Sequence, residues 1–157
     1  MGIKLTPGLK ANNPGNLRWG RAWPGLVGYW TDDDGRKFCK FRTMAEGLRA
    51  LLDNAATYPQ RYGVKTLQEF GNVWAPASDN KGDSQYGTRL ATWCGVKPDA
   101  AYDFRGTLSL YTLARAIIRN ENGVAMLALI EPQEIRAAAE VVSATGGTFP
   151  PKVTAFA

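Results

Sequence analysis

The chain of 157 residues contains no histidine. This absence excludes Ser-His-Asp triads and Cys-His pairs, because both need an imidazole as the base. It also argues against zinc peptidases and zinc amidases, whose metal sites normally contain histidine. Among hydrolytic chemistries, those that rest on carboxylates fit this sequence most naturally. We therefore expect no metal and no other cofactor.

Cysteine is scarce as well, with only Cys39 and Cys94. Two cysteines are too few for a disulfide framework, and these two lack the spacing of a metal site, so we expect both to be reduced. No apolar run approaches the roughly 20 residues that a membrane-spanning helix needs. Residues 1–10 lack the apolar core of a signal peptide, so we expect synthesis in the cytoplasm without an export signal.

Basic residues outnumber acidic ones, 19 to 14, and the formal net charge is +5. Such a charge favours an anionic partner, which could be nucleic acid, a bacterial envelope or an acidic lipid surface. The apolar fraction of 45% and the charged fraction of 21% are typical of a globular protein. From the length we expect a monomer with one domain over residues 1–145 and a loosely held tail over residues 146–157.

Apolar periodicity predicts a mainly α-helical domain with one small β-hairpin, hence the α+β class. Asp34-Gly35 lies between two alternating runs, which indicates a hairpin over residues 27–41. Residues 1–12 are expected to be an extended lead-in with a turn at Pro7-Gly8. The expected helices cover residues 43–58, a short segment from Thr66 through Trp74, residues 84–94, residues 108–121 and a last helix that begins at Pro132 and ends before Gly146-Gly147.

The chain is organised around the helix expected over residues 108–121. Five apolar residues recur at helical spacing and form its inner face: Leu110, Leu113, Ala114, Ile117 and Ile118. Glu121 stands at the end of this face, just before Asn122-Gly123, where a helix would stop. A carboxylate there opposes the negative end of the helix dipole, and this favours the protonated form. A protonated carboxyl group is what cleavage of a glycosidic bond requires of its general acid.

The other acids have structural explanations, which leaves Glu121 as the main candidate. Five glutamates have helix-capping spacing or surround the last helix: Glu46, Glu69, Glu131, Glu134 and Glu140. Asp79 and Asp83 lie in a polar loop, where acids usually bond to nearby backbone. The alternative for Glu121 is a solvated acid at a frayed helix end, and the position alone does not exclude it.

Four motifs occur in order: NNPGNLR at residues 12–18, F-x-x-M-x-E-G-L-R-A-L at 41–51, W-A-P-x-x-D-N at 74–80 and AIIRNENG at 116–123. Together they resemble a family of small phage-encoded proteins, described as virion-associated or endolysin-like, with a lysozyme-like fold. The resemblance implies a protein made in the host cytoplasm. It would act on bacterial peptidoglycan in the periplasm or cell wall, or be carried in the virion.

The segment at 114–123 is also similar to the helix that ends in Glu-Ser-Gly in lytic transglycosylases, with Asn122 in place of the serine. The N-terminal half resembles flagellar and autolysin-type glucosaminidases, in which a turn precedes a hairpin and a helix. In those enzymes the acid helix comes first, whereas here it comes last. The resemblance therefore implies a circularly permuted lysozyme-like fold, in which Glu121 lies close to the turn at residues 12–19 and to Tyr86.

On this basis we expect Glu121 to protonate the leaving glycosidic oxygen. Asp79, with Asp83 beside it, is the candidate for a second catalytic carboxylate if water attacks; a lytic transglycosylase would need none. The expected substrate-binding residues are Tyr86, Asn16, Arg18 and Asn122. A non-catalytic phage structural or peptidoglycan-binding module remains the alternative. Nucleic-acid binding is weaker, because the basic residues are scattered along the chain rather than clustered in one segment.

The absence of histidine leads to a first prediction. Cleavage of peptidoglycan by this protein should persist at full rate in a chelating buffer, and it should not depend on free thiols. The measurement is the loss of turbidity of a peptidoglycan suspension with and without a chelator and a thiol reagent. Activity that disappears on chelation and returns with a divalent ion would contradict a site built on carboxylates alone.

Overall fold

The computed structural model describes residues 2–78 and 82–154. The chain is mainly helical with one two-stranded antiparallel sheet, so the expected α+β class is confirmed. The elements follow in the order α1 (Pro7–Lys10), β1 (Leu26–Thr31), β2 (Lys37–Phe41), α2 (Met44–Ala56), α3 (Tyr58–Tyr62), α4 (Leu67–Trp74), α5 (Tyr86–Cys94), α6 (Thr107–Asn122), α7 (Val124–Leu127) and α8 (Pro132–Thr145). Within the described ranges no helix has the length and apolar character needed to cross a membrane.

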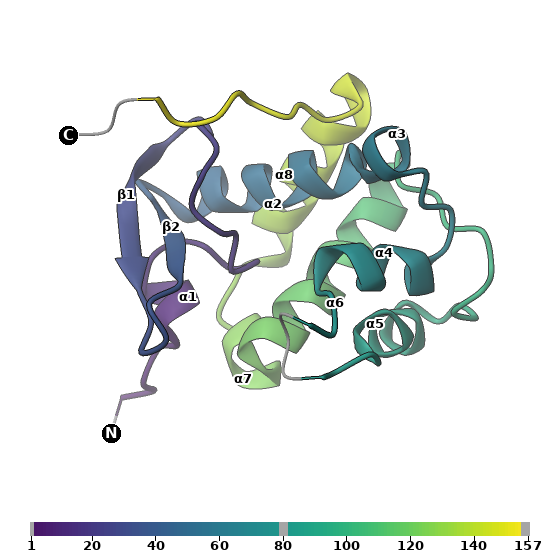
Figure 1. The fold of residues 1–157 in the computed structure, drawn as a ribbon, viewed down its shortest axis with the longest axis horizontal. Coiled ribbons are helices and arrows are strands. Elements are labelled where there is room, and N and C mark those ends of the chain that lie inside the picture. The colour runs from purple at the N-terminus through teal and green to yellow at the C-terminus, as the bar shows by residue number, and fades with distance from the viewer. Residues whose placement is uncertain (1, 79–81, 155–157) are drawn as a thin grey trace.

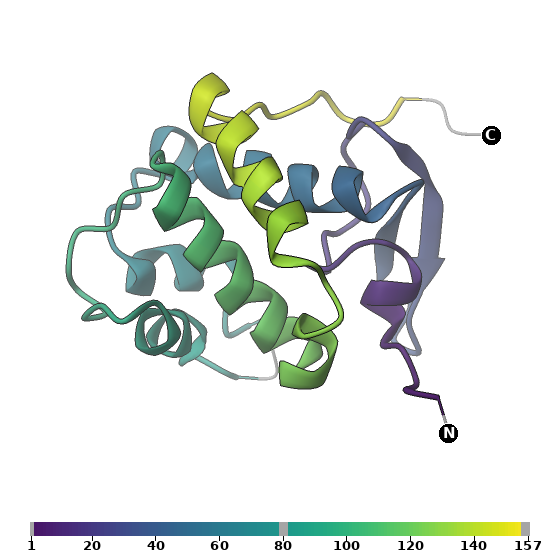
Figure 2. The same cartoon turned by 180° about the vertical axis from the view of Figure 1, so that it is seen from behind.

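Helix α6 forms the centre of the main hydrophobic core. All five residues predicted for its inner face are buried, as expected from their spacing. Helices α2, α5 and α8 pack against it, and Figure 2 shows α6 and α8 side by side at the back of the molecule. Because this face is buried against α2, α5 and α8, the C-terminal end of α6 has a fixed position, and Glu121 is fixed with it.

The hairpin, α1 and the turn at residues 12–19, which we call the asparagine turn, form the other side of the molecule (Figure 1). The side chain of Asn13 is completely buried and fixes this turn to β2. Its amide nitrogen donates to the carbonyls of Leu17 and Cys39, both at 3.0 Å, and its amide oxygen accepts from the Leu17 backbone at 2.9 Å. Because the buried Asn13 side chain makes all three of these hydrogen bonds, it holds the turn rigidly.

The N-terminal lead-in is not extended throughout, contrary to the expectation for residues 1–12. Pro7 begins the one-turn helix α1, and the Thr6 hydroxyl caps it by accepting from the Leu9 backbone. Thr followed by Pro is a helix-start signature, which the expectation of a Pro-Gly turn overlooked. The helix expected over residues 43–58 ends earlier, since α2 ends at Ala56, and Pro59 belongs to the separate short helix α3.

The C-terminal segment is also held more firmly than expected. Residues 146–154 run across to the hairpin side, where the backbone of Ala22 donates to Pro151 at 2.9 Å and that of Val153 donates to Gly20 at 2.9 Å (Figure 1). The ring of Phe149 packs edge-on against Trp23, with centroids 5.9 Å apart. The expected loose tail over 146–157 is therefore wrong for residues 146–154, and residues 155–157 lie outside the described part. After Gly146-Gly147 the chain turns back and packs against the hairpin side. The sequence pattern of two glycines is the same for such a turn and for the start of a loose tail.

Two close backbone approaches depend on glycine. A Cβ atom at Gly47 would collide with the backbone carbonyl of Asn12, which explains the glycine in the first turn of α2. A Cβ atom at Gly71 in α4 would collide with the backbone of Gly87 in α5, and one at Gly87 would collide with the carbonyl of Leu67. Helices α4 and α5 therefore cross in direct backbone contact, and this crossing sets the position of Tyr86.

The crossing gives a second prediction. Gly71→Ala should lower the free energy of unfolding by about 1–2 kcal/mol, because overpacking costs more than the roughly 1 kcal/mol that helix propensity gains. Urea unfolding measures the change. Asn72→Ala, at the neighbouring exposed position of the same helix, is the control and should lie within about 0.5 kcal/mol of wild type. A Gly71→Ala protein as stable as the control would mean that the two helices separate without cost.

Candidate active site

The carboxylate of Glu121 is held through both oxygens by residues from two distant parts of the chain. The amide of Asn16, in the asparagine turn, donates to Oε1 at 2.9 Å. The hydroxyl of Tyr86, the first residue of α5, donates to Oε2 at 2.6 Å. The structure therefore brings together the three segments that the sequence analysis expected to meet. Glu121 itself is partly exposed at the last turn of α6, so the carboxylate is oriented and still accessible.

Asn16 adopts a left-handed backbone conformation with φ 50°, which asparagine tolerates better than most residues. Its amide oxygen is buried against Gly8, where an added Cβ atom would lie 2.6 Å away. The turn, the glycine of α1 and the carboxylate of Glu121 thus fix the orientation of this amide, with the nitrogen toward the acid.

Asn122 has a different place from the one expected for a substrate-binding residue. Its amide nitrogen donates to the Pro14 carbonyl at 2.7 Å, and its amide oxygen accepts from the Thr6 hydroxyl at 2.7 Å. These bonds join the end of α6 to α1 and the asparagine turn. The Asn122 side chain therefore holds the two halves of the site in register, and its two polar atoms are occupied by the protein itself.

Tyr86 is 2% exposed, so its phenol is removed from water while its hydroxyl faces Glu121. Burial first, and then the charge and the hydrogen bond of the Glu121 carboxylate, hold the pKa of Tyr86 well above its ordinary value. The phenol accordingly remains protonated and available as a donor. Tyr86 was expected to hold a sugar. Its hydroxyl orients the carboxylate of Glu121, and the residue also lines the cavity beside that acid.

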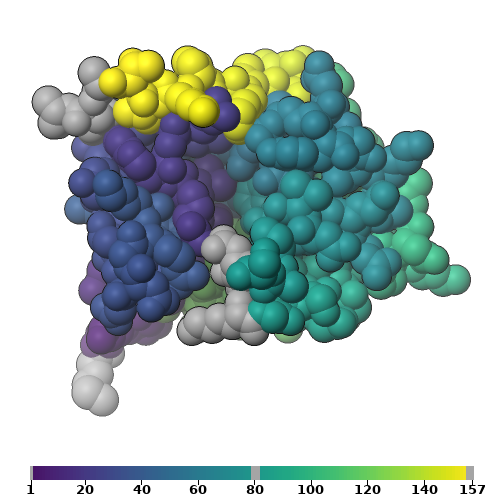
Figure 3. All heavy atoms as spheres, in the orientation of Figure 1, coloured from purple at the N-terminus to yellow at the C-terminus, as the bar shows by residue number. Residues whose placement is uncertain are grey.

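Glu121 opens into a cavity of about 390 Å³. The hairpin side supplies Gly15, Asn16, Arg18, Arg36 and Phe38, and the helical side supplies Trp74, Ala75, Asp83, Tyr86, Arg89, Asn120 and Glu121. In Figure 3 the purple and blue atoms of the hairpin side and the teal atoms of the α4 and α5 region lie on opposite sides of the same face of the molecule. Of the expected site residues, Asn16, Arg18, Tyr86 and Glu121 all line this cavity.

A second cavity of about 410 Å³ continues from the first. The two share Gly15, Asn16, Arg18 and Trp74, and we refer to them together as the groove. The groove follows the boundary between the hairpin side and the helical side. A groove of this kind fits an elongated ligand better than a small compact one.

The two aspartates considered as a second carboxylate have different outcomes. Asp79 lies outside the described residues. Asp83 lines the first cavity, where it receives two hydrogen bonds from Arg89, the shorter at 2.6 Å. The guanidinium of Arg89, with help from the Gln85 backbone, holds the pKa of Asp83 below its usual range. The cavity thus contains a second carboxylate that stays ionised at neutral pH.

Several residues that line the groove were missed as site residues from the sequence, among them Trp74, Arg89 and Asn120. Trp74 was expected at the end of a short helix and in the motif at residues 74–80, without a role in the site, yet it lines both cavities. Arg89 donates to Asn120 at 2.7 Å and so connects Asp83 to the residue next to Glu121. Only the position of Asn120 beside the acid could have indicated this network, because the contact joins α5 to α6.

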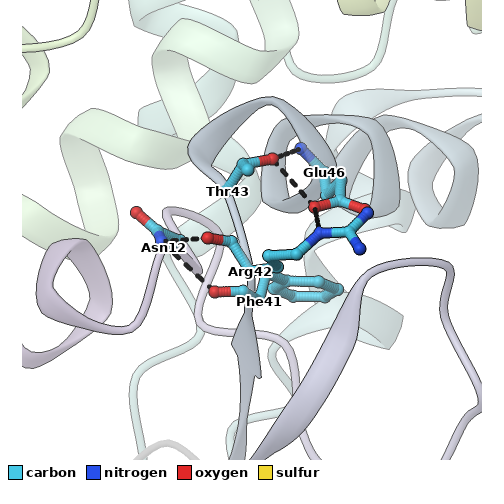
Figure 4. A network of polar contacts seen from close by, with 5 residues as sticks. All are labelled: Asn12, Phe41, Arg42, Thr43 and Glu46. Carbon is cyan, nitrogen blue, oxygen red and sulfur yellow. Dashed lines mark hydrogen bonds and ion pairs between the residues drawn. The ribbon is translucent and has the colours of Figure 1, made fainter.

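Glu46, the other glutamate inside a recognisable motif, does not reach the groove. Its carboxylate accepts from Arg42 at 2.7 Å and from the Thr43 hydroxyl at 2.9 Å, and Asn12 holds the adjoining carbonyls of Phe41 and Arg42 (Figure 4). The hydrogen bond from Arg42, followed by that from Thr43, lowers the pKa of Glu46. A carboxyl group kept ionised at the start of a helix has the features of a capping residue, not those of an acid catalyst.

No model of a known protein family matches this chain, and no curated protein matches it. The functional argument therefore depends on the chemistry of the groove. The Glu121 side chain fixed through both oxygens, the ionised Asp83 and several guanidinium groups line one mostly polar cavity. Such a site is suited to proton transfer on a polar, oxygen-rich substrate.

The buried phenols give a third prediction, on pH. Unfolded tyrosines ionise near pH 10, whereas Tyr86 stays protonated in the folded protein, as does Tyr58, whose pKa burial raises to about 12. The unfolded state thus binds fewer protons above about pH 10, and stability should fall there by up to about 1.4 kcal/mol per pH unit for each such tyrosine.

Urea unfolding between about pH 9 and pH 11 measures this slope. Tyr86→Phe removes one contributing group, so its free energy of unfolding should fall less steeply than that of wild type. Tyr58→Phe should show a similar reduction and serves as the comparison. Identical slopes for wild type and Tyr86→Phe would show that the phenol ionises equally in both states.

Proposed function

We propose that this protein is a lysozyme-like, circularly permuted domain that cleaves the glycan strands of bacterial peptidoglycan, with Glu121 as the general acid. One observation carries the proposal: a glutamate at the end of a buried helix is held through both oxygens and still faces an open groove. Its chemistry needs no histidine, in agreement with the composition.

The two hydrogen bonds to Glu121 suit a residue that must lose a proton. Each carboxyl oxygen has two lone-pair sites, so the bonds from Asn16 and Tyr86 leave sites free to face a glycosidic oxygen. When the proton has been transferred to the leaving oxygen, the resulting carboxylate is stabilised by both donors. A hydroxyl can also rotate from donor to acceptor, so Tyr86 serves both protonation states of the acid.

Two routes follow protonation, and they place different demands on the site. In a lytic transglycosylase, Glu121 would next accept the proton of the muramyl 6-hydroxyl, and an anhydro product would form without a second carboxylate. In a hydrolase, a base would activate water, and Asp83 is the described carboxylate in the same cavity. Its ion pair with Arg89 keeps it ionised, as a base must be. Asp79, outside the described residues, is the other candidate.

The shape and charge of the groove agree with a polymeric, acidic substrate. The two adjoining cavities offer a continuous surface on both sides of Trp74, whose ring is a face on which a sugar could stack. Arg18, Arg36 and Arg89 line the first cavity, and the chain as a whole carries a net charge of +5. This charge would raise the rate of encounter with an anionic envelope. A phage-encoded lysin, released at lysis or carried in the virion, is the biological role that we propose.

The alternative role is a module that holds the glycan without cutting it. It would use the same groove and would not need the acid. Substitution of Glu121 therefore separates the two roles, since only cleavage depends on its proton.

The fourth prediction concerns this residue. Glu121→Gln preserves the volume of the side chain but cannot supply a proton. Turnover of purified peptidoglycan should fall by about 10²–10⁴-fold, or roughly 3–5 kcal/mol in activation free energy. Folding and binding to insoluble peptidoglycan should persist. Release of soluble muropeptides measures turnover, and a sedimentation assay measures binding.

Glu140→Gln is the matched control, because Glu140 is exposed on α8 and paired only with Arg136 among the described residues. It should retain wild-type turnover. Glu46→Gln should remain active as well, since Gln can replace Glu in a capping position. A Glu121→Gln protein with unchanged turnover would overturn the assignment of the acid. A wild-type protein that binds peptidoglycan but releases nothing would favour the non-catalytic module.

Mass analysis of the released fragments then identifies the reaction. Anhydro-muramyl ends indicate the transglycosylase route. Reducing ends indicate hydrolysis, and the sugar that carries the reducing end identifies the bond that is cut. If hydrolysis is found and Asp83 is the base, Asp83→Asn should abolish cleavage. A hydrolase that stays active with Asp83→Asn must use another base. If anhydro ends are found, the same substitution should leave the reaction type unchanged.

A further inference from the structure

The second cavity is strongly basic. Four cationic residues line it, Arg18, Arg21, Arg61 and Lys152, and no acidic residue among the described ones does so. Much of the remaining lining is aromatic and comes from Trp19, Trp23, Tyr58, Trp74 and Phe149. This combination of guanidinium groups and rings differs from the first cavity, where Asp83 and Glu121 balance part of the charge.

Arg61 is rigidly positioned in this cavity while keeping its charge available. Its guanidinium donates to Asn54 at 2.9 Å and to the Tyr62 hydroxyl at 2.9 Å, and it lies 3.3 Å from the centroid of the Phe149 ring. These partners are all neutral, so they orient the group without neutralising it. Pre-organised arginines of this kind bind carboxylates with little loss of side-chain entropy.

Arg21 and Lys152 add a second, independent indication of an anionic ligand. They are direct partners in an isolated antiparallel bridge between the N-terminal half and the C-terminal segment. Like charges at directly opposed positions destabilise a strand pair. Arg21 lies above the Phe149 ring at 4.4 Å, and within the described part of the chain neither residue has an acidic partner. An anion bound between them would remove this repulsion.

We propose that the second cavity binds the carboxylate-bearing peptide that is attached to the glycan strand next to the cleavage point. The inference rests on the proposed function, since it assigns the substituent that the groove receives beside the cleaved sugars. The two cavities share Asn16, Arg18 and Trp74, so a substituent of a sugar placed near Glu121 reaches the basic cavity without a gap. The peptide supplies carboxylates for the cations and apolar groups for the rings.

The proposal gives the C-terminal segment a function. Phe149 and Lys152 both come from residues 146–154, which the groove would lack if this segment were a loose tail. The protein would therefore prefer glycan strands that carry peptides over bare glycan. Removal of the peptide turns the lactyl amide of muramic acid into a free carboxylate, which shares the chemistry of the peptide carboxylates and must be separated from them by experiment.

The fifth prediction uses the double variant Arg21→Gln/Lys152→Gln. Lys40→Gln/Lys97→Gln, at two exposed positions that do not line the groove, is the control with the same change in net charge. Three substrates are compared at one ionic strength: glycan strands with peptides, the same strands after an amidase has removed the peptides, and chitin oligosaccharides without any carboxylate. The measured quantity is kcat/KM for each pair of protein and substrate.

For strands with peptides, the double variant should lose about tenfold or more in kcat/KM, the effect expected for a lost hydrogen bond to a charged group. On peptide-free strands and on chitin it should equal the wild type. The control variant should match the wild type on each substrate. A loss that is the same on strands with and without peptides would show that the cavity accepts the lactyl carboxylate freed by the amidase as readily as a peptide carboxylate, and would overturn the assignment to the peptide.

Equal kcat/KM values of wild type and double variant on every substrate would also overturn the inference, while leaving cleavage by Glu121 untouched. If the wild type cuts none of the substrates, the proposed function fails and the cavity is tested by binding instead. The double variant should then sediment less than wild type with insoluble peptidoglycan. With the amidase-treated material the two proteins should sediment equally. A loss of affinity only for a DNA oligonucleotide would identify a general polyanion site and contradict the proposal.

Discussion

The hydrogen-bonded carboxylate of Glu121 is the junction on which the arrangement of the groove depends. It accepts from Asn16 on the hairpin side and from Tyr86 on the helical side, so one side chain joins two walls. Asn122, the next residue, fixes the same helix end to Pro14 and Thr6. The buried Tyr86 hydroxyl would cost about 1–3 kcal/mol without a partner, and the other bonds are partly buried, so these contacts favour a single alignment of the two sides.

Close backbone packing supports this junction from both directions. The contact of Gly71 with Gly87 brings α5 close enough to α4 for the first residue of α5 to reach α6. On the other side, the contact of Gly47 with the Asn12 carbonyl brings the asparagine turn against α2. The site thus rests on packed elements and a buried Asn13, not on a free loop. Such support maintains the geometry that acid catalysis needs.

The charges in the groove are distributed unevenly, and this distribution suggests a division of tasks. Around Glu121, an ionised Asp83 and its partner Arg89 lie near the proposed reaction. Beyond Trp74 the described lining is cationic and aromatic, with Lys152 contributed by the C-terminal segment. The first region is suited to proton transfer and the second to recognition of an anion. Under the proposed function, the net charge of +5 would attract an acidic substrate, while the carboxylates lie where proton transfer would take place.

The sequence by itself determined the longer helices α2, α4, α5, α6 and α8, the hairpin and the position of Glu121 at a helix end, because these follow from apolar periodicity and from capping signals within a few residues. It did not determine the short helices α1, α3 and α7. It also indicated which segments would meet if the resemblance to a permuted lysozyme-like fold held. Only the tertiary structure decided that Asn122 ties elements together, that Tyr86 is buried against the acid, and that the segment after Gly146-Gly147 returns to line the groove. Each of these facts is a contact between residues far apart in the chain. Local sequence patterns do not predict such contacts, because the contacts depend on how whole helices and strands pack.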